Sequence, residues 1–316
     1  MSIAFVFPGQ GSQRPGMGKA LFDAFQEAKD VFLEVDEALK QNLSSMIFEG
    51  AEDLNLTSNI QPALMTVSMA VVRVLEKQGK FDISSNIAFL AGHSLGEYSA
   101  LCAAKSIPLA ETAKLLRIRG KAMNDASPPG KGTMAAFIRV DMPTALEIVS
   151  LASKESGEVC CVANDNADGQ IVISGTVLGV DKAIAIAAEK GFKRAIKLPV
   201  QGAFHSPLMR PVADVLFETL QHIEIKTPIV PLISNVIASE VTDTETIKKL
   251  LVEQVTGSVR WRESVLYMKS RGVDRLIECG SATVLSDLTK RIDASVIGTA
   301  LSTPEDIEAF LKSVEC

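Results

Sequence analysis

Hydrophobic and polar positions form two patterns that alternate along the chain. Short apolar runs predict buried β-strands, whereas longer stretches with an apolar residue every three or four positions predict amphipathic helices. The strands predicted in this way are 3–7, 87–91, 229–234, 274–278 and 295–299. The predicted helices are 18–40, 61–78, 97–104, 114–123 and 304–314. Because strands and helices alternate, we expect an α/β fold with a mostly parallel sheet.

The order of elements changes in the middle of the chain, after the turn-forming sequence 127–130 (SPPG). The strands predicted there are 133–140, 158–163, 170–174 and 193–198, and the helices are 143–154 and 178–190. The resulting order, βαββαβ, is that of the ferredoxin-like unit. From Pro199 the earlier alternation resumes. We therefore expect a ferredoxin-like subdomain, 128–198, inserted into a large domain formed by 1–127 and 199–316.

Composition and charge narrow the class of protein. Of 316 residues, 47% are hydrophobic and 22% are charged, which is the balance of an ordered globular chain. No apolar run approaches the roughly 18 residues that a membrane-spanning helix needs. Pro8 and Gly9 interrupt the first run, which also lacks the basic start of a signal peptide. A net charge of −6 disfavours nucleic acid as a partner. We expect a cytoplasmic protein that binds neither membrane nor nucleic acid.

Cysteine spacing and the glycine-rich segments argue against a metal or a cofactor. The five cysteines are Cys102, Cys160, Cys161, Cys279 and Cys316. Their number is odd and no C-x-x-C pair occurs, so we expect reduced thiols rather than disulfides or a zinc site. The loop with Gly9 and Gly11 lacks the third glycine of a dinucleotide-binding fingerprint, and no G-K-[ST] phosphate loop occurs. We expect the chain to use no metal and no cofactor.

The sequence Gly92-His93-Ser94-Leu95-Gly96 matches the pattern G-x-S-x-G and lies between a predicted strand and a predicted helix. This context is typical of a nucleophile elbow, in which a sharp turn presents the serine hydroxyl at a helix N-terminus. A glycine-flanked turn with an incidental serine is the alternative interpretation. On the nucleophile interpretation, the large domain is expected to be α/β-hydrolase-like, with Ser94 at the carboxyl end of a strand.

A serine nucleophile needs a base within hydrogen-bonding reach, and the chain has three histidines. His93 ends a predicted strand next to Ser94, so we expect the two side chains to point apart. His222 ends a polar helical stretch and is expected to lie in solvent. His205 lies in an irregular segment that returns to the main sheet, where catalytic groups collect, and is therefore the candidate base. No carboxylate has a distinctive setting as the third member of a triad, although a backbone carbonyl can also orient the ring.

Several longer segments are shared with one enzyme family. They are 5–13 (FVFPGQGSQ), 61–63 (QPA), 92–100 (GHSLGEYSA), 119–123 (RGKAM), 204–206 (FHS) and 288–292 (LTKRI). Together and in this order they resemble the malonyl-CoA:acyl carrier protein transacylases of bacterial fatty acid synthesis, over essentially the full length of the chain. The resemblance implies an S-malonyltransferase, in which malonyl passes from coenzyme A to a serine and then to the phosphopantetheine thiol of acyl carrier protein.

The resemblance also implies roles for individual residues. Ser94 would be the nucleophile and His205 the base, and the backbone N–H groups of Gln10 and Leu95 would form the oxyanion hole. Arg119 would bind the malonyl carboxylate, and Gln61 would line the pocket. The backbone of Gln254 would orient the histidine. Arg117 and Arg119 are two positions apart, about 200° around a helix, so we expect one to be buried and the other solvated. The resemblance selects Arg119, whose guanidinium fork suits a carboxylate.

Two other functions stay open at this point. A serine hydrolase such as a thioesterase would use the same nucleophile and base, and a comparison of hydrolysis with transfer to a thiol separates the two. A non-catalytic scaffold that binds carrier protein is disfavoured, because Ser94, His205 and Arg119 are all present.

The expected partners are malonyl-CoA and acyl carrier protein, and we expect the chain to be a monomer. Carrier protein is expected to be acidic, as this chain is overall, so docking requires a local basic surface. The candidate residues are Lys190, Lys193, Arg194 and Lys197 in one cluster and Lys290 and Arg291 in another.

Overall fold

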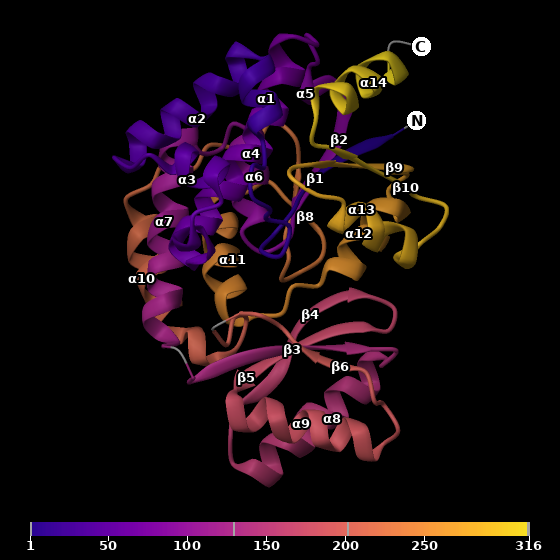
Figure 1. Cartoon of the computed structure of the whole chain (residues 1–316). Helices are drawn as coiled ribbons and strands as arrows, with labels where there is room; N and C mark the ends of the chain where they lie inside the picture. Colours follow the sequence, from indigo (N-terminus) through magenta and orange to yellow (C-terminus); the bar gives the residue numbers. More distant parts are fainter. Residues whose placement is uncertain (1, 129, 201, 315–316) are drawn as a thin grey trace.

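The computed structural model describes residues 2–128, 130–200 and 202–314. Pro129 of the predicted turn and the predicted thiol Cys316 lie outside these ranges. In Figure 1 the chain forms a larger α/β part, near whose top both ends of the chain lie, and a smaller part below it that is built from the middle of the sequence. No helix within the described ranges has the length and apolar character needed to cross a membrane.

The larger part is built on a six-stranded sheet. In spatial order its strands are β10 (Ile297–Leu301), β9 (Arg275–Cys279), β1 (Ile3–Phe7), β2 (Ile87–Gly92), β7 (Leu232–Ile233) and β8 (Glu240–Val241). Neighbouring strands pair in parallel, except that β7 and β8 are antiparallel. The predicted bounds hold for β1 and are shifted by one or two residues in β2, β9 and β10. The predicted α/β fold with a mostly parallel sheet is therefore confirmed.

Helices cover both faces of this sheet (Figure 1). They are α1 (Lys19–Ala24), α2 (Gln26–Leu39), α3 (Leu43–Glu49), α4 (Thr57–Lys77), α5 (Ile83–Asn86), α6 (Gly96–Ala103), α7 (Leu109–Ala126), α10 (Arg210–Gln221), α11 (Thr244–Thr256), α12 (Trp261–Ser270), α13 (Val284–Ile292) and α14 (Pro304–Val314), with short 3₁₀ turns at Glu52–Asn55 and Pro207–Met209. Along β1, Phe5 and Phe7 belong to the core on one face and Ala4 and Val6 to the core on the other. A strand covered on both faces is apolar at every position, which explains the uninterrupted run IAFVF.

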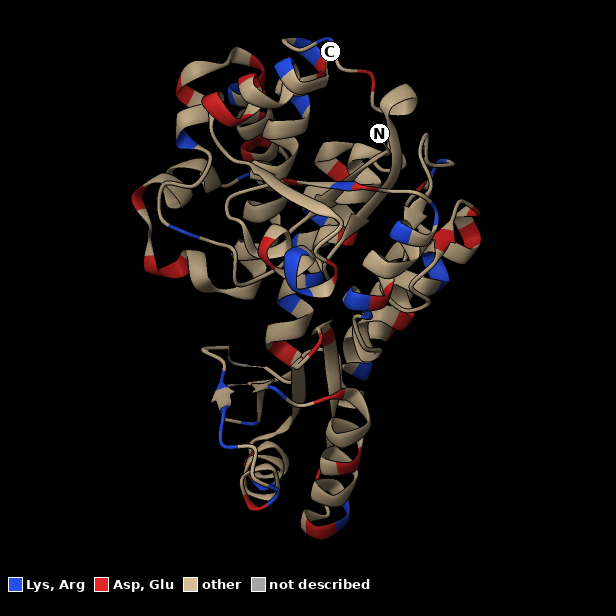
Figure 2. Ribbon diagram, turned by 90° about the vertical axis from the view of Figure 1, so that its right-hand side faces the viewer, with Lys and Arg blue, Asp and Glu red and all other residues tan. Residues whose placement is uncertain are grey.

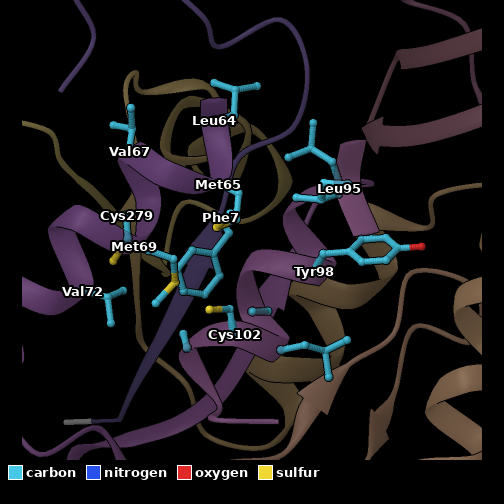
Figure 3. Packing of buried hydrophobic residues seen from close by; sticks show 14 of the residues in the cluster. Phe7, Leu64, Met65, Val67, Met69, Val72, Leu95, Tyr98, Cys102 and Cys279 are labelled. Carbon is cyan, nitrogen blue, oxygen red and sulfur yellow. The ribbon is translucent and has the colours of Figure 1, made fainter. Parts of the chain in front are cut away.

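Figure 3 shows the core that holds the central strand against two helices. Phe7 lies among Met65 and Met69 of α4 on one side and faces α6, which carries Tyr98, on the other. All four side chains are buried. This packing fixes the carboxyl end of β1 relative to the start of α6.

Several helices differ from the prediction, and the predicted helix 114–123 is the middle of the longer α7, which begins at Leu109. The predicted helix 18–40 is interrupted at Phe25, whose extended backbone (φ −129°, ψ 126°) separates α1 from α2. The predicted helix 61–78 begins four residues earlier, at Thr57, and contains Pro62 in its second turn. Helix α3 was not predicted, because it spans seven residues and its start depends on a side-chain cap, in which Asn42 accepts a hydrogen bond from the Ser45 N–H.

The smaller part has a four-stranded antiparallel sheet. In spatial order its strands are β4 (Cys160–Ala167), β5 (Gln170–Thr176), β3 (Gly132–Ile138) and β6 (Ala195–Lys197). Helices α8 (Met142–Ser156) and α9 (Val177–Glu189) lie together on the side away from the larger part (Figure 1). Each begins at a side-chain cap, Asp141 for α8 and Thr176 for α9. The elements follow the predicted βαββαβ order.

The two parts of the molecule are joined along β4. Asn164 forms a parallel bridge with Val259, and the backbone groups of Asp165 and Val259 are hydrogen-bonded at 2.9 Å. The Asp165 carboxylate also forms an ion pair with Arg262 of α12, at 2.9 Å. One residue further along β4, the Asn166 side chain is 2.9 Å from a ring nitrogen of His93. This contact brings the smaller sheet to the turn that carries Ser94.

Candidate active site

Ser94 lies on a tight turn between the end of β2 and the start of α6, as the motif predicts. Its backbone has φ 54°, a left-handed conformation that is rare for a residue with a side chain. Two glycines make the turn possible. A Cβ at Gly92 would lie 1.9 Å from the carbonyl carbon of Gly96, and a Cβ at Gly96 would lie 2.1 Å from the carbonyl oxygen of Phe7. The serine hydroxyl is thus presented at a helix N-terminus beside the end of the central strand.

Asn235 holds this turn from the neighbouring strand. It follows β7, and its Oδ1 accepts a hydrogen bond from the Ser94 N–H at 2.8 Å, while its Nδ2 donates to the Gly92 carbonyl at 2.6 Å. The two bonds bracket the strained residue on both sides. Backbone strain at a functional position persists when the surroundings determine the conformation in this way.

His205 contacts Ser94, although the two residues are 111 positions apart in the sequence. Its Nε2 lies 2.8 Å from Ser94 Oγ. Its Nδ1 lies 2.9 Å from the carbonyl oxygen of Gln254, so Nδ1 carries the proton and Nε2 is free to accept one from the serine. His205 is 4% exposed, and burial, with the nearby positive charge of Arg119 as a smaller cause, lowers its pKa to about 3. The imidazole is therefore neutral at neutral pH, which is the form that can act as a base.

The other two histidines lie elsewhere. His93 points toward Asn166 and packs near the ring of Trp261, with ring centroids 5.9 Å apart. Burial lowers the pKa of His93. His222 is exposed at the end of α10. The expectation that both side chains point away from Ser94 or into solvent matches these positions.

Arg119 extends from α7 into the same site and is 1% exposed. Its Nη1 donates to Gln61 Oε1 at 2.7 Å, and its Nη2 donates to Ser94 Oγ and to Gln254 Oε1, both at 3.1 Å. Its guanidinium carbon also lies 5.4 Å from the centre of the Tyr98 ring. No carboxylate in the described part of the chain comes within 4.0 Å of this guanidinium, and its Nε has no partner there. Arg119 is thus a buried cation held by neutral groups.

Arg117 differs in part from the expectation of a solvated side chain. It is half-buried, and its Nε and Nη2 are shielded from solvent without a hydrogen-bond partner in the described residues. Burial lowers its pKa. It has no hydrogen bond to Ser94 or Gln61, whereas Arg119 is hydrogen-bonded to both.

The backbone N–H groups of Gln10 and Leu95 lie on the two segments that flank the nucleophile. Gly9, in the loop after β1, packs closely against the turn that carries Ser94. A Cβ at Gly9 would lie 2.7 Å from the carbonyl oxygen of His93. Leu95 is the residue that precedes the first turn of α6. Within residues 2–128, 130–200 and 202–314, neither N–H has a protein acceptor. The helix dipole of α6 favours negative charge near the serine.

Glu97 and Asn235 are parts of this site that sequence reasoning missed. Glu97 is 1% exposed, and its Oε2 accepts hydrogen bonds from the Gln254 Nε2 at 2.8 Å and from the Asn235 N–H at 3.1 Å. Burial raises the pKa of Glu97 to about 7. Glu97 lies three residues after Ser94, which places it on the same side of the helix start, and Asn235 lies two residues after β7, the strand next to β2. Polar residues at the ends of adjacent parallel strands were the signal that could have found Asn235.

Thiols and metal-binding groups were also considered as site residues. Cys102, Cys160, Cys161 and Cys279 are free, and burial raises the pKa of each. Across the residues that the structure describes, no three His, Cys, Asp or Glu side chains gather as a metal-binding group. The side chains within hydrogen-bonding distance of the Ser94 hydroxyl are those of His205 and Arg119.

Comparisons with known proteins place this site in a family. The model of the acyl transferase domain matches residues 4–291. The malonyl CoA-acyl carrier protein transacylases of Bacillus subtilis and Escherichia coli K12 are 46% and 40% identical over 314 and 311 residues, which cover 99% and 98% of this chain and 97% and 99% of theirs.

Solved structures agree with this placement. The acyl-carrier-protein-S-malonyltransferase from Bartonella henselae superposes with a TM-score of 0.96 at 50% identity and covers the whole of both chains. A malonyl-transacylase in complex with its type II PKS acyl-carrier protein matches with a TM-score of 0.95 at 35% identity, over 99% of this chain and all of the other. This chain therefore belongs to the acyl transferase family and, within it, to the malonyl-CoA:acyl carrier protein transacylases.

Proposed function

We propose that this chain is a malonyl-CoA:acyl carrier protein S-malonyltransferase that works through a malonyl ester of Ser94. Membership of its family makes it an acyltransferase. The observation that carries the proposal is the buried guanidinium of Arg119, which has no anionic partner within 4.0 Å in the described chain and lies 3.1 Å from the serine hydroxyl. A malonyl ester on Ser94 would place its free carboxylate one methylene beyond the ester carbonyl, within reach of that fork.

In the first half-reaction Ser94 Oγ attacks the thioester carbon of malonyl-CoA, and its proton passes to His205 Nε2, 2.8 Å away. The oxyanion that forms is held by the N–H groups of Gln10 and Leu95. Collapse of the intermediate breaks the carbon–sulfur bond, and the coenzyme A sulfur takes the proton from His205. The Gln254 carbonyl keeps the imidazole in the required tautomer through Nδ1–H.

In the second half-reaction the phosphopantetheine thiol of the carrier protein takes the place of coenzyme A. It gives its proton to His205 Nε2 and attacks the ester carbon. Ser94 Oγ then leaves with that proton, and the malonyl group is bound to the carrier as a thioester. This order of events is ping-pong covalent catalysis. Because every group in the sequence comes from one chain, the proposed unit of function is a monomer.

The architecture supports a division of this work between two domains. We assign 1–127 and 199–316 to an α/β-hydrolase-like domain, since it carries the nucleophile turn at the carboxyl end of a parallel strand. We assign 128–198 to a ferredoxin-like subdomain, on the basis of its βαββαβ order and antiparallel pairing. The free thiols in the described chain are in keeping with the expected cytoplasmic location.

A transfer assay tests the proposal. The purified chain is mixed with malonyl-CoA and holo acyl carrier protein, and malonyl-carrier and free malonate are measured by mass spectrometry. We expect malonyl-carrier to form much faster than malonate, and Ser94→Ala and His205→Ala to lower the transfer rate by at least about 10³-fold. Malonate as the main product would assign the chain to hydrolysis, and activity that survives in Ser94→Ala would refute the mechanism.

A further inference from the structure

Glu97 lies behind the nucleophile rather than beside the substrate, and it contacts the two residues that connect the site. We propose that Glu97 is a positioning residue for acyl transfer, whose Oε2 fixes the side chain of Gln254 and the backbone of Asn235 and, through them, Ser94, His205 and Arg119. This inference rests on the proposed function and adds a residue with no assigned role to it.

The first contact of Glu97 sets the orientation of the Gln254 amide. Gln254 Nε2 donates to Glu97 Oε2 at 2.8 Å, to the Ser94 carbonyl at 3.0 Å and to Asn235 Oδ1 at 3.3 Å. Gln254 Oε1 accepts from Arg119 Nη2 at 3.1 Å. A flipped amide would direct an NH₂ group at the guanidinium and an oxygen at three acceptors. The amide therefore has one favourable orientation, and Glu97 supplies the shortest bond that selects it.

Gln254 connects three groups of the site at once. Its side chain holds Arg119 and the Ser94 backbone, and its own carbonyl accepts the Nδ1–H of His205. A shift of this residue would move the base, the nucleophile and the carboxylate-binding group together. Small displacements of catalytic groups matter, because a misplacement of about 1 Å can lower a rate about 10²-fold.

The second contact of Glu97 holds the clamp on the nucleophile turn. The Asn235 N–H donates to Glu97 Oε2 at 3.1 Å, and the Asn235 side chain bonds the Ser94 N–H and the Gly92 carbonyl. The left-handed backbone of Ser94 depends on that clamp. A single carboxylate oxygen is thus linked through one residue to each of Ser94, His205 and Arg119.

Substitutions of Glu97 separate this role from a general contribution to folding. Glu97→Gln keeps an oxygen that can accept both hydrogen bonds, whereas Glu97→Ala removes it. We expect Glu97→Ala to lower kcat for malonyl transfer by about 10²-fold, because Gln254 and Asn235 then no longer fix the base and the nucleophile. Glu97→Gln should restore kcat to within about threefold of the unmodified enzyme. Asn235→Ala should resemble Glu97→Ala.

Glu278 offers a matched control. It is also fully buried, it is the last residue but one of β9, and its Oε2 accepts hydrogen bonds from the Ser286 N–H at 2.8 Å and from Ser286 Oγ at 2.9 Å. It has no hydrogen bond to Gln254 or Asn235 in the described structure. Glu278→Ala removes the same kind of group, so its kcat per folded molecule should stay within about threefold of the parent.

Acylation of Ser94 by p-nitrophenyl acetate is followed alongside, because this neutral ester needs the nucleophile and base but not Arg119. If the unmodified chain transfers no malonyl, the proposed function fails, and the ester still tests the positioning role. The inference is overturned if Glu97→Ala keeps kcat within about threefold in both assays, if Glu97→Gln is as slow as Glu97→Ala, or if Glu278→Ala is equally slow. Should Glu97→Ala not fold, Glu97→Asp, which withdraws the carboxylate by one methylene, should likewise lower kcat at least about tenfold in both assays, and a kcat within about threefold of the parent would overturn the inference.

Discussion

Arg119 holds a buried positive charge whose hydrogen-bond partners, Gln61, Ser94 and Gln254, are all neutral. Burial lowers its pKa, although a guanidinium remains charged in proteins. A buried charge without a counter-charge is unfavourable. A ligand whose carboxylate pairs with this guanidinium is therefore bound more favourably than one without a carboxylate. Acyl selectivity is therefore expected to depend on this residue.

Substitution of Arg119 tests that expectation. We expect Arg119→Ala to lower malonyl transfer by about 10²-fold or more and acetyl transfer much less. The malonyl carboxylate loses its bidentate partner in this variant, whereas acetyl has no carboxylate. Initial rates with malonyl-CoA and with acetyl-CoA give the ratio of malonyl transfer to acetyl transfer. Arg117→Ala is the control on the same helix and should keep the ratio within about twofold, since the two side chains lie about 200° apart. An unchanged ratio in Arg119→Ala would contradict the assigned role.

The protonation of His205 makes a prediction about pH. Its pKa is lowered to about 3, mainly by burial, so the neutral base is present above that value and is lost only as the pH falls toward it. Acylation by p-nitrophenyl acetate between pH 4.5 and 8 should therefore show no acid limb near 6.5. Glu97, with a pKa raised to about 7, titrates in this range, so the profile is measured in Glu97→Gln as well. A limb near pH 6.5 that persists in Glu97→Gln would contradict the neutral, buried histidine.

At the level of elements, the site depends on how closely α6 approaches the end of β1. Gly96 begins α6 against the carbonyl oxygen of Phe7, and Gly92 closes β2 against Gly96. Neither glycine position has space for a Cβ, and the residue between them with the strained backbone is Ser94. The packing of these elements, rather than a contact with substrate, places the hydroxyl.

Gly96→Ala tests the packing. The added methyl would lie 2.1 Å from a backbone oxygen, so we expect a loss of stability of about 1–3 kcal/mol or more and a large loss of acylation. Ser99→Ala in the same helix is the comparison, because Ser99 Oγ is buried without a partner in the described chain, and its removal should be neutral or slightly stabilising. Thermal unfolding and ester acylation measure both. Native activity in Gly96→Ala would show that the turn tolerates movement.

Sequence patterns predicted the strands of the main sheet within one or two residues, apart from β7 and the unpredicted β8, because buried parallel strands are apolar throughout. They also placed Ser94 and His205, whose types and settings are distinctive. They did not reveal Glu97 or Asn235, because the residue type alone does not tell whether a carboxylate or an amide is buried or exposed. The break at Phe25 was missed for a similar reason, since the apolar spacing continues across it.

At the scale of the whole molecule, docking of an acidic carrier must overcome a net charge of −6. In the ribbon of Figure 2, Lys and Arg residues alternate with Asp and Glu residues along most of the chain. In the first predicted cluster, Lys190 and Lys197 form ion pairs with Glu147 and Asp181, at 2.8 and 2.5 Å. In the second cluster Arg291 is hydrogen-bonded to Gln170, a residue of β5. The side chains of Lys193 and Arg194, which are exposed and make no ion pair in the described chain, are the stronger candidates in the first cluster.

Salt dependence tests this assignment. We expect the rate of transfer to carrier protein to fall as ionic strength rises, and Lys193→Ala/Arg194→Ala to lower it by about tenfold and flatten the dependence. Lys77→Ala/Lys80→Ala is the control, because Lys77 ends α4 roughly 24 Å along the helix from Gln61, and Lys80 follows it by three residues. Acylation by malonyl-CoA alone separates carrier docking from coenzyme A binding. A rate that does not vary with salt would exclude electrostatic steering.

The meeting of Ser94, His205 and Arg119 is tested most directly by the mass of the intact protein after brief mixing with malonyl-CoA. The unmodified chain should gain the mass of one malonyl group, located on Ser94 by peptide mapping and released when holo carrier protein is added. His205→Ala should gain it far more slowly, and Ser94→Ala should not gain it. A malonyl group on another residue, or one that the carrier cannot remove, would contradict the account.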